Sequence, residues 1–337
     1  MKEQILQYLR ERDGFVSGQE LGERFGVSRT SVWKAIQRLT EMGYGIEAVR
    51  NRGYRLISEP DLLTQARVSE CLHTEWTGQP VLVFDSVDST NNEAKRLAEE
   101  GAAEGLVVIG DEQTAGRGRR GRGWASARGE GIFLSLLLRP DIAPGCASML
   151  TLVMGLAVRD VMAEACSAAD VQTDAAKDSV WIKWPNDIVI DGKKVCGILT
   201  EMTAEPDCVH YVVIGVGINV HNEAFPEEAA QTAASLYQQT GRHFCRAELV
   251  AACLQRFEAY YATFLATQDL SGLMDACNAH LINRGREVRI LNAPADGIDR
   301  GTARGINAWG ELVIDTAEGT RRVSSGEVSV RGVYNYV

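Results

Sequence analysis

Residues 106–138 read LVVIGDEQTAGRGRRGRGWASARGEGIFLSLLL, two apolar runs of strand length on either side of a loop in which glycine alternates with arginine. The two runs, residues 106–110 and 132–138, predict neighbouring strands of a buried sheet. The loop, residues 116–124, matches by letter the G-x-G-x-x-G fingerprint of dinucleotide-binding proteins. That fingerprint requires an apolar helix directly after the glycines, and none follows here, so we exclude a dinucleotide site.

A loop rich in glycine and arginine can close around an anion, because backbone N–H groups and guanidinium groups both donate hydrogen bonds to phosphate or carboxylate. The alternative is a disordered basic linker. The loop is short, lies between two apolar runs and ends at Trp124. These features favour an anion-binding loop.

Upstream of this stretch, residues 81–84 predict a strand, and a helix is expected to reach about residue 100. The junction between them carries Ser89, Thr90 and Asn91. Polar side chains at a strand-to-helix junction can cap the helix. They can also bind a small polar ligand above the sheet, and the sequence leaves both interpretations open.

Downstream, residues 188–190 and 195–199 predict a hairpin, because Asp191 and Gly192 between them form a strong hairpin-turn dipeptide. Lysines at 183, 193 and 194 surround Asn186 and Asp187. Ammonium groups near a carboxylate and an amide fit a nucleotide–magnesium site, in which lysine offsets phosphate charge. A surface turn with solvated lysines explains the same residues equally well.

A last apolar run, residues 211–219, predicts a buried strand with glycines near its end, at Gly215 and Gly217. Glycine there lets a flat ligand approach the backbone closely, or it marks a β-bulge. The sequence offers no serine–histidine–acid arrangement and no cysteine–histidine pair. Catalysis by these residues is therefore expected to be electrostatic, by neutralising anions while a phosphorus centre is displaced.

The N-terminal residues predict a winged helix-turn-helix. Ser17 and Glu20 have the spacing of a capping box for a second helix, which Gly26 ends. Ser28 can cap a third helix whose inner face is apolar at positions 32, 36 and 39. Helix, glycine turn and helix followed by a hairpin at residues 46–57 is the order of a helix-turn-helix with a wing.

The outward side of this third helix and the wing carry residue types that bind phosphates and base edges. They are Ser28, Arg29, Thr30, Ser31, Trp33, Lys34, Arg38, Arg50, Arg52 and Arg55. A solvated basic face for contacts with another protein is the alternative, and the basic wing makes DNA binding the better interpretation.

The charge distribution supports a nucleic-acid contact at the N-terminus only. Residues 1–58 hold ten Lys/Arg and seven Asp/Glu, a balance of +3, whereas the remaining 25 Lys/Arg and 38 Asp/Glu give −13. The whole 337-residue chain carries −10. A basic N-terminal segment followed by an acidic remainder is the charge pattern expected of a DNA-binding domain joined to another domain.

The start of the chain is amphipathic rather than a signal sequence, and we find no apolar run long enough to span a bilayer. The eight cysteines are scattered without a C-x-x-C pair, which predicts reduced, buried side chains rather than disulfides or zinc ligands. A cytoplasmic protein that does not bind membranes is expected.

Four strings now carry a resemblance: Ser89-Thr90-Asn91, the 116–124 loop, KWPND at 183–187 and GVGIN at 215–219. In this order they resemble those of biotin–protein ligases. With the winged helix, the chain resembles the bifunctional form that is also the biotin operon repressor, over nearly its whole length.

The resemblance implies an α+β protein of three domains. A winged helix-turn-helix DNA-binding domain would occupy residues 1–60. A biotin- and ATP-binding catalytic domain with a mixed sheet like that of class II synthetases would occupy residues 66–282. An SH3-like β-barrel would occupy residues 284–337, with strands near 288–291, 302–306, 312–315, 321–323 and 328–331.

The resemblance also implies a reaction in two steps. The carboxylate of biotin attacks the α-phosphorus of ATP to give biotinyl-5′-adenylate and pyrophosphate. A lysine amine of a biotin carboxyl carrier protein then attacks the adenylate, giving an amide and AMP. ATP with Mg²⁺, biotin and this acceptor domain are therefore the expected cofactors, substrate and partner.

Residue roles follow from the same resemblance. Lys194 and Arg119 would be catalytic. Biotin would be held by Ser89, Thr90, Asn91, Gln113, Gly116, Arg117, Gly118, Arg119, Lys194, Gly197 and Gly217. The nucleotide would be held by Arg119, Arg122, Trp124, Lys183, Asn186, Asp187 and Asn219, with Asp187 meeting the ATP-bound Mg²⁺ and Phe225 a candidate cover for adenine.

The family further implies regulation. The adenylate would order the arginine-rich loop and promote a homodimer that places two winged helices on an operator. Three alternatives stay open at this point: a lipoate–protein ligase, a transcription factor whose ligase-like body only senses a metabolite, and a ligase whose winged helix no longer binds DNA.

Overall fold

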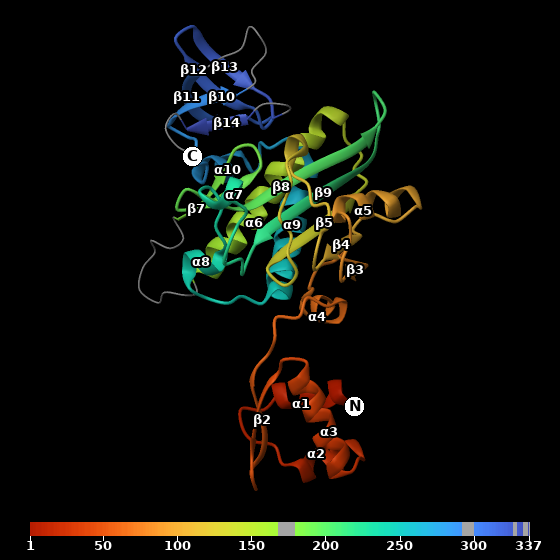
Figure 1. Ribbon diagram of the computed structural model, residues 1–337. Helices are drawn as coiled ribbons and strands as arrows, with labels where there is room; N and C mark the ends of the chain where they lie inside the picture. Colours follow the sequence, from red (N-terminus) through yellow and green to blue (C-terminus); the bar gives the residue numbers. More distant parts are fainter. Residues whose placement is uncertain (168–178, 292–299, 326–328, 333–335, 337) are drawn as a thin grey trace. The chain divides into compact units, whose positions relative to one another are not determined.

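The computed structural model describes residues 1–167, 179–291, 300–325, 329–332 and 336, and the chain divides into two compact units, Met1–Leu62 and Leu63–Val337 (Figure 1). Residue 328, placed in a strand by the sequence, and residues 168–178 lie outside the described residues. Each unit has its own hydrophobic core.

The first unit is a winged helix, as the sequence predicts. Its elements are α1 (Lys2–Arg10), α2 (Gly18–Phe25), α3 (Arg29–Glu41), β1 (Gly45–Val49) and β2 (Gly53–Ser58), with β1 and β2 paired antiparallel. Both predicted caps form, because the side chains of Ser17 and Ser28 accept hydrogen bonds from the backbone N–H groups of Glu20 and Ser31. The capping box is incomplete: the Glu20 carboxylate accepts from the Tyr8 hydroxyl at 2.9 Å, a tertiary contact that the local pattern does not contain.

The second unit is built on a seven-stranded mixed sheet with the order β3-β4-β5-β9-β8-β7-β6. Only β3 and β4 are parallel, and every other neighbouring pair is antiparallel. The bounds are β3 (Val81–Phe84), β4 (Val107–Gly110), β5 (Gly131–Leu138), β6 (Val180–Lys183), β7 (Asp187–Ile190), β8 (Lys193–Ala204) and β9 (Val209–Asn219). The predicted mixed sheet is confirmed, including the β7–β8 hairpin at Asp191 and Gly192, which both have positive φ.

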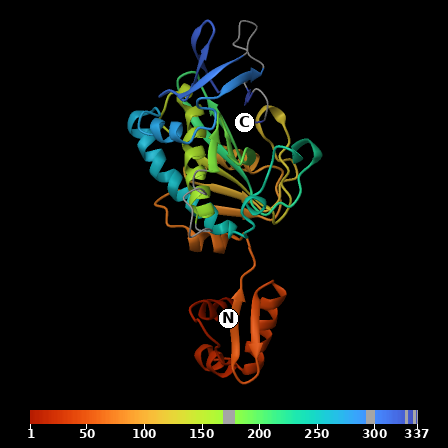
Figure 2. The ribbon, with the colours of Figure 1, turned by 90° about the vertical axis from the view of Figure 1, so that its left-hand side faces the viewer.

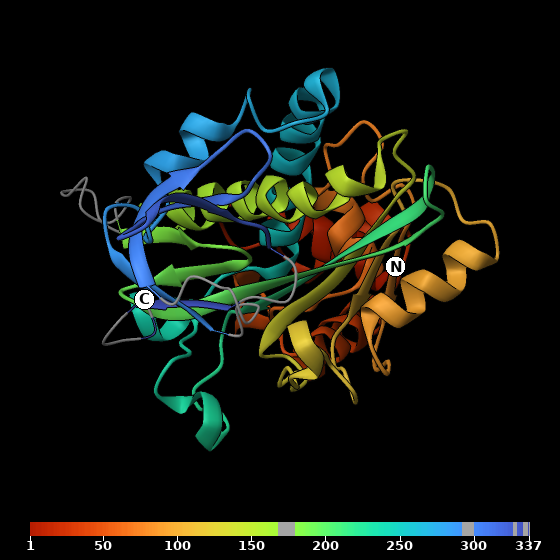
Figure 3. The same cartoon turned by 90° about the horizontal axis from the view of Figure 1, so that it is seen from above.

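Helices cover the two faces of this sheet differently. The helix α5 (Thr90–Glu99) packs on one face, and α6 (Leu150–Ser167) and α9 (Arg246–Thr267) lie side by side on the other (Figures 2 and 3). Alternate residues of a strand point to opposite faces. Val107 and Ile109 therefore join the core under α6 and α9, whereas Val108 joins the core under α5. This explains why these strands read as unbroken apolar runs.

The remaining elements of this unit are short. They are α4 (Gln65–Cys71), η1 (Arg119–Gly121), η2 (Pro144–Met149), α7 (Glu227–Ala230), α8 (Leu236–Thr240) and α10 (Met274–Ala279). The predicted helix at residues 90–100 is α5, and the glycine–arginine loop leads into β5.

Two expectations, on membrane-spanning length and on the cysteines, need correction. Residues Pro144–Ser167 form a helical stretch long and apolar enough to cross a membrane, and 83% of its most apolar window is buried inside the protein. The apolar character belongs to a core helix that packs against the sheet and against α9. The described cysteines form no disulfide with one another, but Cys208 is exposed, and Cys71 and Cys245 are half-buried, rather than buried.

The C-terminal strands form a five-stranded antiparallel sheet with the order β13-β12-β11-β10-β14. These are β10 (Glu287–Leu291), β11 (Arg300–Ile306), β12 (Leu312–Thr316), β13 (Gly319–Val323) and β14 (Ser329–Gly332). The indole N–H of Trp184, which is fully buried, donates to the Gly310 carbonyl at 3.0 Å. The sheet is thereby tied directly to the KWPND segment.

Candidate functional site

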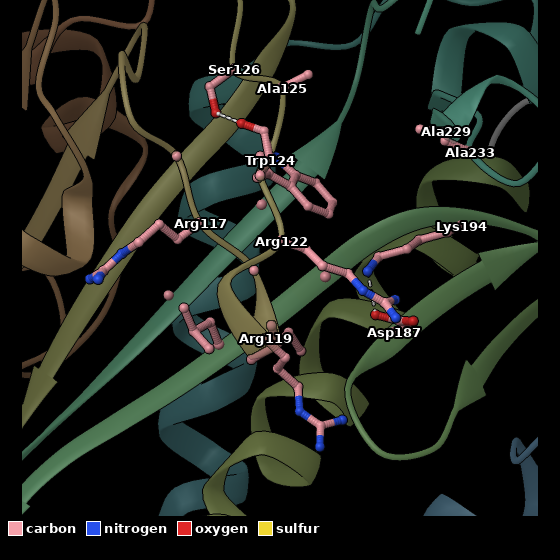
Figure 4. A pocket seen from close by; sticks show the side chains of 18 of the residues that line it. Arg117, Arg119, Arg122, Trp124, Ala125, Ser126, Asp187, Lys194, Ala229 and Ala233 are labelled. Carbon is pink, nitrogen blue, oxygen red and sulfur yellow. Dashed lines mark hydrogen bonds and ion pairs between the residues drawn. The ribbon is translucent and has the colours of Figure 1, made fainter. Parts of the chain in front are cut away.

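One pocket of about 800 Å³ is lined by residues of β8 and β9, by the glycine–arginine loop and by residues 225–233 (Figure 4). Every residue predicted for biotin or the nucleotide lines it, although these residues come from segments far apart in the sequence. The lining contains six Lys/Arg side chains (Arg117, Arg119, Arg120, Arg122, Lys183 and Lys194) and two carboxylates (Asp187 and Glu228). The pocket is therefore positively charged and suited to anions.

Trp124 lies against two glycines of neighbouring strands. Gly197 on β8 and Gly217 on β9 are paired in register. A Cβ atom at Gly197 would lie 2.8 Å from the indole ring, and one at Gly217 would lie 2.6 Å from it. The β-bulge interpretation is wrong, because the β8–β9 register is continuous from Cys196↔Ile218 to Thr203↔Tyr211. The glycines let the chain's own aromatic ring approach the sheet.

The polar residues at the β3–α5 junction form a hydrogen-bonded floor. Ser89 is the N-cap residue of α5 but makes no side-chain capping bond, so capping does not explain this serine. Gln113 Oε1 accepts from the Thr90 backbone N–H at 2.9 Å, and Gln113 Nε2 donates to Ser126 Oγ at 2.9 Å. Asn91 is buried and directs its amide at Ser135 and Glu201. The floor is thus pre-organised by bonds within the protein.

The glycine–arginine loop presents its arginines in different directions (Figure 4). The Arg117 guanidinium donates to Asn92 Oδ1 at 2.5 Å, on the α5 side. Arg119 donates to Asn186 Oδ1 at 3.1 Å and also to the backbone carbonyl of Ser325. Burial lowers the pKa of Arg119 from its ordinary value, with the neighbouring arginines adding to the shift and Asp187 opposing it.

Asp187 is the buried acidic centre of the pocket. Its Oδ2 accepts from the Tyr336 hydroxyl at 2.5 Å, and its Oδ1 lies 2.6 Å from Lys194 Nζ. Burial alone would raise the pKa of this carboxyl, but Lys194, Lys183 and the Tyr336 hydroxyl together hold the pKa below its ordinary value. The Lys183 ammonium lies 4.0 Å from the centre of the Tyr336 ring.

Two polar atoms in the pocket lack a hydrogen-bond partner within the described part of the chain. They are the indole nitrogen of Trp124 and Asp187 Oδ1, both buried. The Lys194 ammonium approaches that oxygen closely, at 2.6 Å, but outside hydrogen-bond alignment. Buried polar atoms are normally paired, so the Trp124 nitrogen marks a place where a ligand group fits, whereas Asp187 Oδ1 is ion-paired with Lys194.

Sequence reasoning did not find several residues of the site. Ser126 completes the floor, Ser135 and Glu201 support it from outside the pocket lining, and Tyr336 reaches Asp187 from the C-terminal part of the chain. Ser135 had a signal, because it is the single polar residue in the apolar run 132–138. Nothing local marks Tyr336. Phe225, with Pro226, Ala229 and Ala233, also lines the pocket.

The first unit presents a separate surface on α3. The side chains predicted to meet DNA are exposed there, with Trp33 48% exposed, except Ser31, which is half-buried. The inner residues Val32, Ile36 and Leu39 are buried. On the wing, Arg50 and Arg52 are exposed and Arg55 is half-buried. Within the described residues there is no group of three or more His, Cys, Asp or Glu that could hold a metal ion.

Comparison with known proteins divides the chain into three matching regions. Residues 83–219 match the biotin/lipoate A/B protein ligase family, residues 2–55 match a helix-turn-helix domain, and residues 285–331 match the biotin protein ligase C-terminal domain. The bifunctional ligase/repressor BirA of Bacillus subtilis is 40% identical over 318 residues, 94% of both chains. The protein of the same name from Escherichia coli is 31% identical over 320 residues, 94% of this chain and 93% of that one.

Comparison with solved structures likewise finds a biotin protein ligase. The biotin protein ligase from Aquifex aeolicus, in complex with biotin and ATP, superposes with a TM-score of 0.63 at 30% identity. The alignment covers 75% of this chain and 99% of that one.

Proposed function

Because this chain belongs to the family of bifunctional ligase/repressors, we propose that it attaches biotin to an acceptor protein at the expense of ATP and represses transcription as a DNA-binding protein. One observation carries the ligase part. A single pocket joins a neutral, hydrogen-bonded floor to a mouth lined by lysine and arginine, which suits a ligand with an uncharged head and an anionic tail beside a nucleotide.

Biotin's cyclic urea lies on the floor, at Ser89, Thr90 and Gln113, and its aliphatic tail passes beneath Gly116, Arg117 and Gly118. In the first step a carboxylate oxygen of biotin bonds to the α-phosphorus of ATP as the bond to the pyrophosphate oxygen breaks. In the second step a lysine amine of a biotin carboxyl carrier protein bonds to the acyl carbon, AMP leaves and the amine loses its proton.

Lys194 is the main electrostatic catalyst, because its ammonium offsets the charge that builds up between the carboxylate and the α-phosphate. Arg119, already anchored to Asn186, holds the adenylate, and Arg122, which is exposed on the loop, meets the phosphates. The unpartnered indole N–H of Trp124 supplies one further donor to the nucleotide. Lys183, Asn186 and Asn219 complete the nucleotide side, and Gly197 and Gly217 line the biotin side.

Magnesium fits this pocket only together with the nucleotide. The pocket contains no cluster of carboxylates among its described residues, and the buried Asp187, whose Oδ1 is ion-paired with Lys194 at 2.6 Å, is the candidate ligand. Magnesium is usually held by one or two carboxylates and the substrate's phosphates. Bound there, it would neutralise phosphate charge, and Asp187 would position it.

Transcriptional repression is assigned to the first unit. Residues 1–60 bind operator DNA through α3 and the wing, residues 66–282 carry the chemistry and residues 284–337 close the nucleotide side. Biotinyl-adenylate acts as corepressor by promoting a homodimer that presents two winged helices, so that unused adenylate shuts off biotin synthesis. Both activities belong to the cytoplasm.

The test is to mix the protein with biotin, Mg–ATP and a carrier domain, and to follow the mass of the carrier. We expect the mass of one biotin to be added, and none on a carrier whose acceptor lysine is changed to arginine. Lipoate in place of biotin separates the two ligase classes of this family. Binding of biotin without any transfer, by a folded protein, would instead make the chain a metabolite sensor.

Repression is tested by measuring affinity for operator DNA with and without biotin and ATP. We expect tighter binding with both ligands, accompanied by a doubling of mass in sedimentation. Unchanged operator affinity at saturating biotin and ATP would refute the corepressor mechanism but leave the ligase intact.

A further inference from the structure

Glu201 on β8 lies just outside the pocket lining and contacts three groups that surround the floor. Its Oε2 accepts from Asn91 Nδ2 at 2.7 Å and lies 3.7 Å from the Arg117 guanidinium, and its Oε1 accepts from Lys95 Nζ at 2.6 Å. Burial alone would raise the pKa of Glu201, but hydrogen bonds from Lys95 and Asn91, with the charges of Lys95 and Arg117, lower the pKa. Near neutral pH the side chain is a carboxylate, which can only accept hydrogen bonds.

This carboxylate fixes the orientation of the Asn91 amide. The Asn91 amide nitrogen faces two acceptors, Glu201 and the Leu199 carbonyl at 3.3 Å. A flipped amide would place its oxygen against both. Asn91 Oδ1 must therefore face Ser135 Oγ, which lies 2.6 Å away. An amide oxygen cannot donate, so the single hydroxyl hydrogen of Ser135 is committed to Asn91.

The hydrogen bond from Ser135 to Asn91 also determines how Ser135 meets the Thr90 hydroxyl. The Ser135 hydroxyl also points at Thr90 Oγ1, 2.8 Å away, but its one hydrogen is held by the shorter contact to Asn91 Oδ1. The Thr90 hydroxyl donates its own hydrogen to Gln113 Oε1 at 3.2 Å, an oxygen that also accepts from the Thr90 backbone N–H at 2.9 Å. With its hydrogen directed away, the Thr90 hydroxyl offers only lone pairs to the pocket.

We infer that Glu201 is a positioning residue that sets the donor and acceptor pattern of the pocket floor and so matches it to the N–H groups of biotin's cyclic urea. The inference rests on the proposed function, because it takes biotin to be the ligand. Gln113 supplies the donor for the urea oxygen. Its Nε2 donates one hydrogen to Ser126 and carries a second that can donate to the urea oxygen. The sequence separation of 110 residues between Asn91 and Glu201 hides this arrangement from pattern analysis.

The test is the substitution Glu201→Gln, measured by calorimetry with biotin alone. Lys95 can only donate, so it draws the glutamine oxygen to itself and leaves the glutamine NH₂ facing Asn91 Nδ2. Two donors then oppose each other and the chain of bonds to Thr90 is lost. A disrupted buried hydrogen bond weakens binding, and we expect the Kd for biotin to rise about tenfold or more. The KM for ATP is expected to change by less than about twofold, since Glu201 lies on the biotin side.

The matched variants separate positioning from simple loss of charge. Lys95→Met alone leaves Glu201 an acceptor and is expected to bind biotin like the wild type. The double variant Lys95→Met/Glu201→Gln lets the glutamine turn its oxygen to Asn91, so affinity is expected to recover most of the way. Ser135→Ala breaks the chain at its other end without touching Glu201, and is expected to weaken biotin binding as Glu201→Gln does.

Wild-type affinity in Glu201→Gln, or a double variant as weak as the single one, would overturn the inference. If Glu201→Gln does not fold, the double variant and Ser135→Ala decide the question by the same criteria. A wild-type protein that gives no heat with biotin overturns the proposed function itself, which is a different outcome from a wild type that binds while its variants fail to differ.

Discussion

The winged-helix surface and the pocket present their functional residues in opposite ways. On α3 the candidate residues lie within eleven positions of one helix, and Trp33 is 48% exposed. In the pocket they come from distant segments, and Thr90, Lys183 and Asp187 are 3%, 4% and 8% exposed. A surface that meets a long polymer needs side chains in water on one rigid element. A pocket that activates a carboxylate needs charges removed from water, which strengthens them.

This difference predicts how each region responds to substitution. A change on α3 removes a contact with a partner and leaves the fold intact. A change in the pocket also leaves a buried group without its partner, so it affects binding, chemistry and stability together.

The largest effect is expected for Lys194→Ala. The rate of biotin transfer should fall about a hundred- to a thousandfold, as removal of one electrostatic catalyst typically gives. Operator affinity without ligands should not change. The control is Lys193→Ala, whose side chain is exposed one position away. Equal losses in both variants would show that general positive charge, rather than the position of Lys194, matters.

Asp187→Asn is expected to lower the free energy of unfolding at pH 7 by roughly 3 kcal/mol, because it leaves Lys194 and Lys183 without a buried counter-charge. The pKa of Asp187 is lowered in the folded protein, so its stabilisation is present above the ordinary carboxyl pKa and is lost as pH falls through the lowered folded value. Urea unfolding of both proteins from pH 7 to pH 3 checks this. The difference in free energy of unfolding between the two proteins should become smaller as the pH falls. A difference that does not change with pH would contradict the role given to Asp187.

Gly217→Ala should act more moderately, since its Cβ would lie 2.6 Å from the Trp124 ring. The indole must move, so we expect about a tenfold weaker affinity for the nucleotide and a loss of stability of about 1–3 kcal/mol. Gly155→Ala in the middle of α6 is the matched control, because its Cβ would meet only Ile198 at 3.7 Å. That variant should gain about 0.5–1 kcal/mol. Thermal unfolding and nucleotide titration measure both.

The smallest effect is expected on the winged-helix side, for Lys34→Ala. Operator affinity should fall about fivefold, and the slope of log affinity against log salt should decrease by about one, if Lys34 contacts one phosphate. Biotin transfer and thermal stability should be unchanged. Gln37→Ala, exposed on the same helix, is the control. A Lys34→Ala variant that also lost biotin transfer would contradict the separation of DNA binding and ligation between the two regions.

The sequence by itself determined what depends on a few neighbouring residues. Ser28 caps α3, Gly26 ends α2 in the left-handed region, and Asp191-Gly192 turns the hairpin. Each of these rests on backbone angles or on a hydrogen bond spanning three or four positions, so a local pattern is sufficient. The four strings of the ligase resemblance likewise predicted which residues would gather in one pocket.

Only the tertiary structure decided how those residues are held. Whether Gly217 marks a bulge or receives Trp124 depends on the register that pairs it with Gly197. The acceptor face of Thr90 depends on Glu201, 110 residues beyond Asn91, and the second oxygen of Asp187 depends on Tyr336, 149 residues away. A buried polar group takes whatever partner the packing of distant strands brings within about 3 Å. Sequence patterns therefore indicated the chemistry, whereas the sheet fixed its geometry.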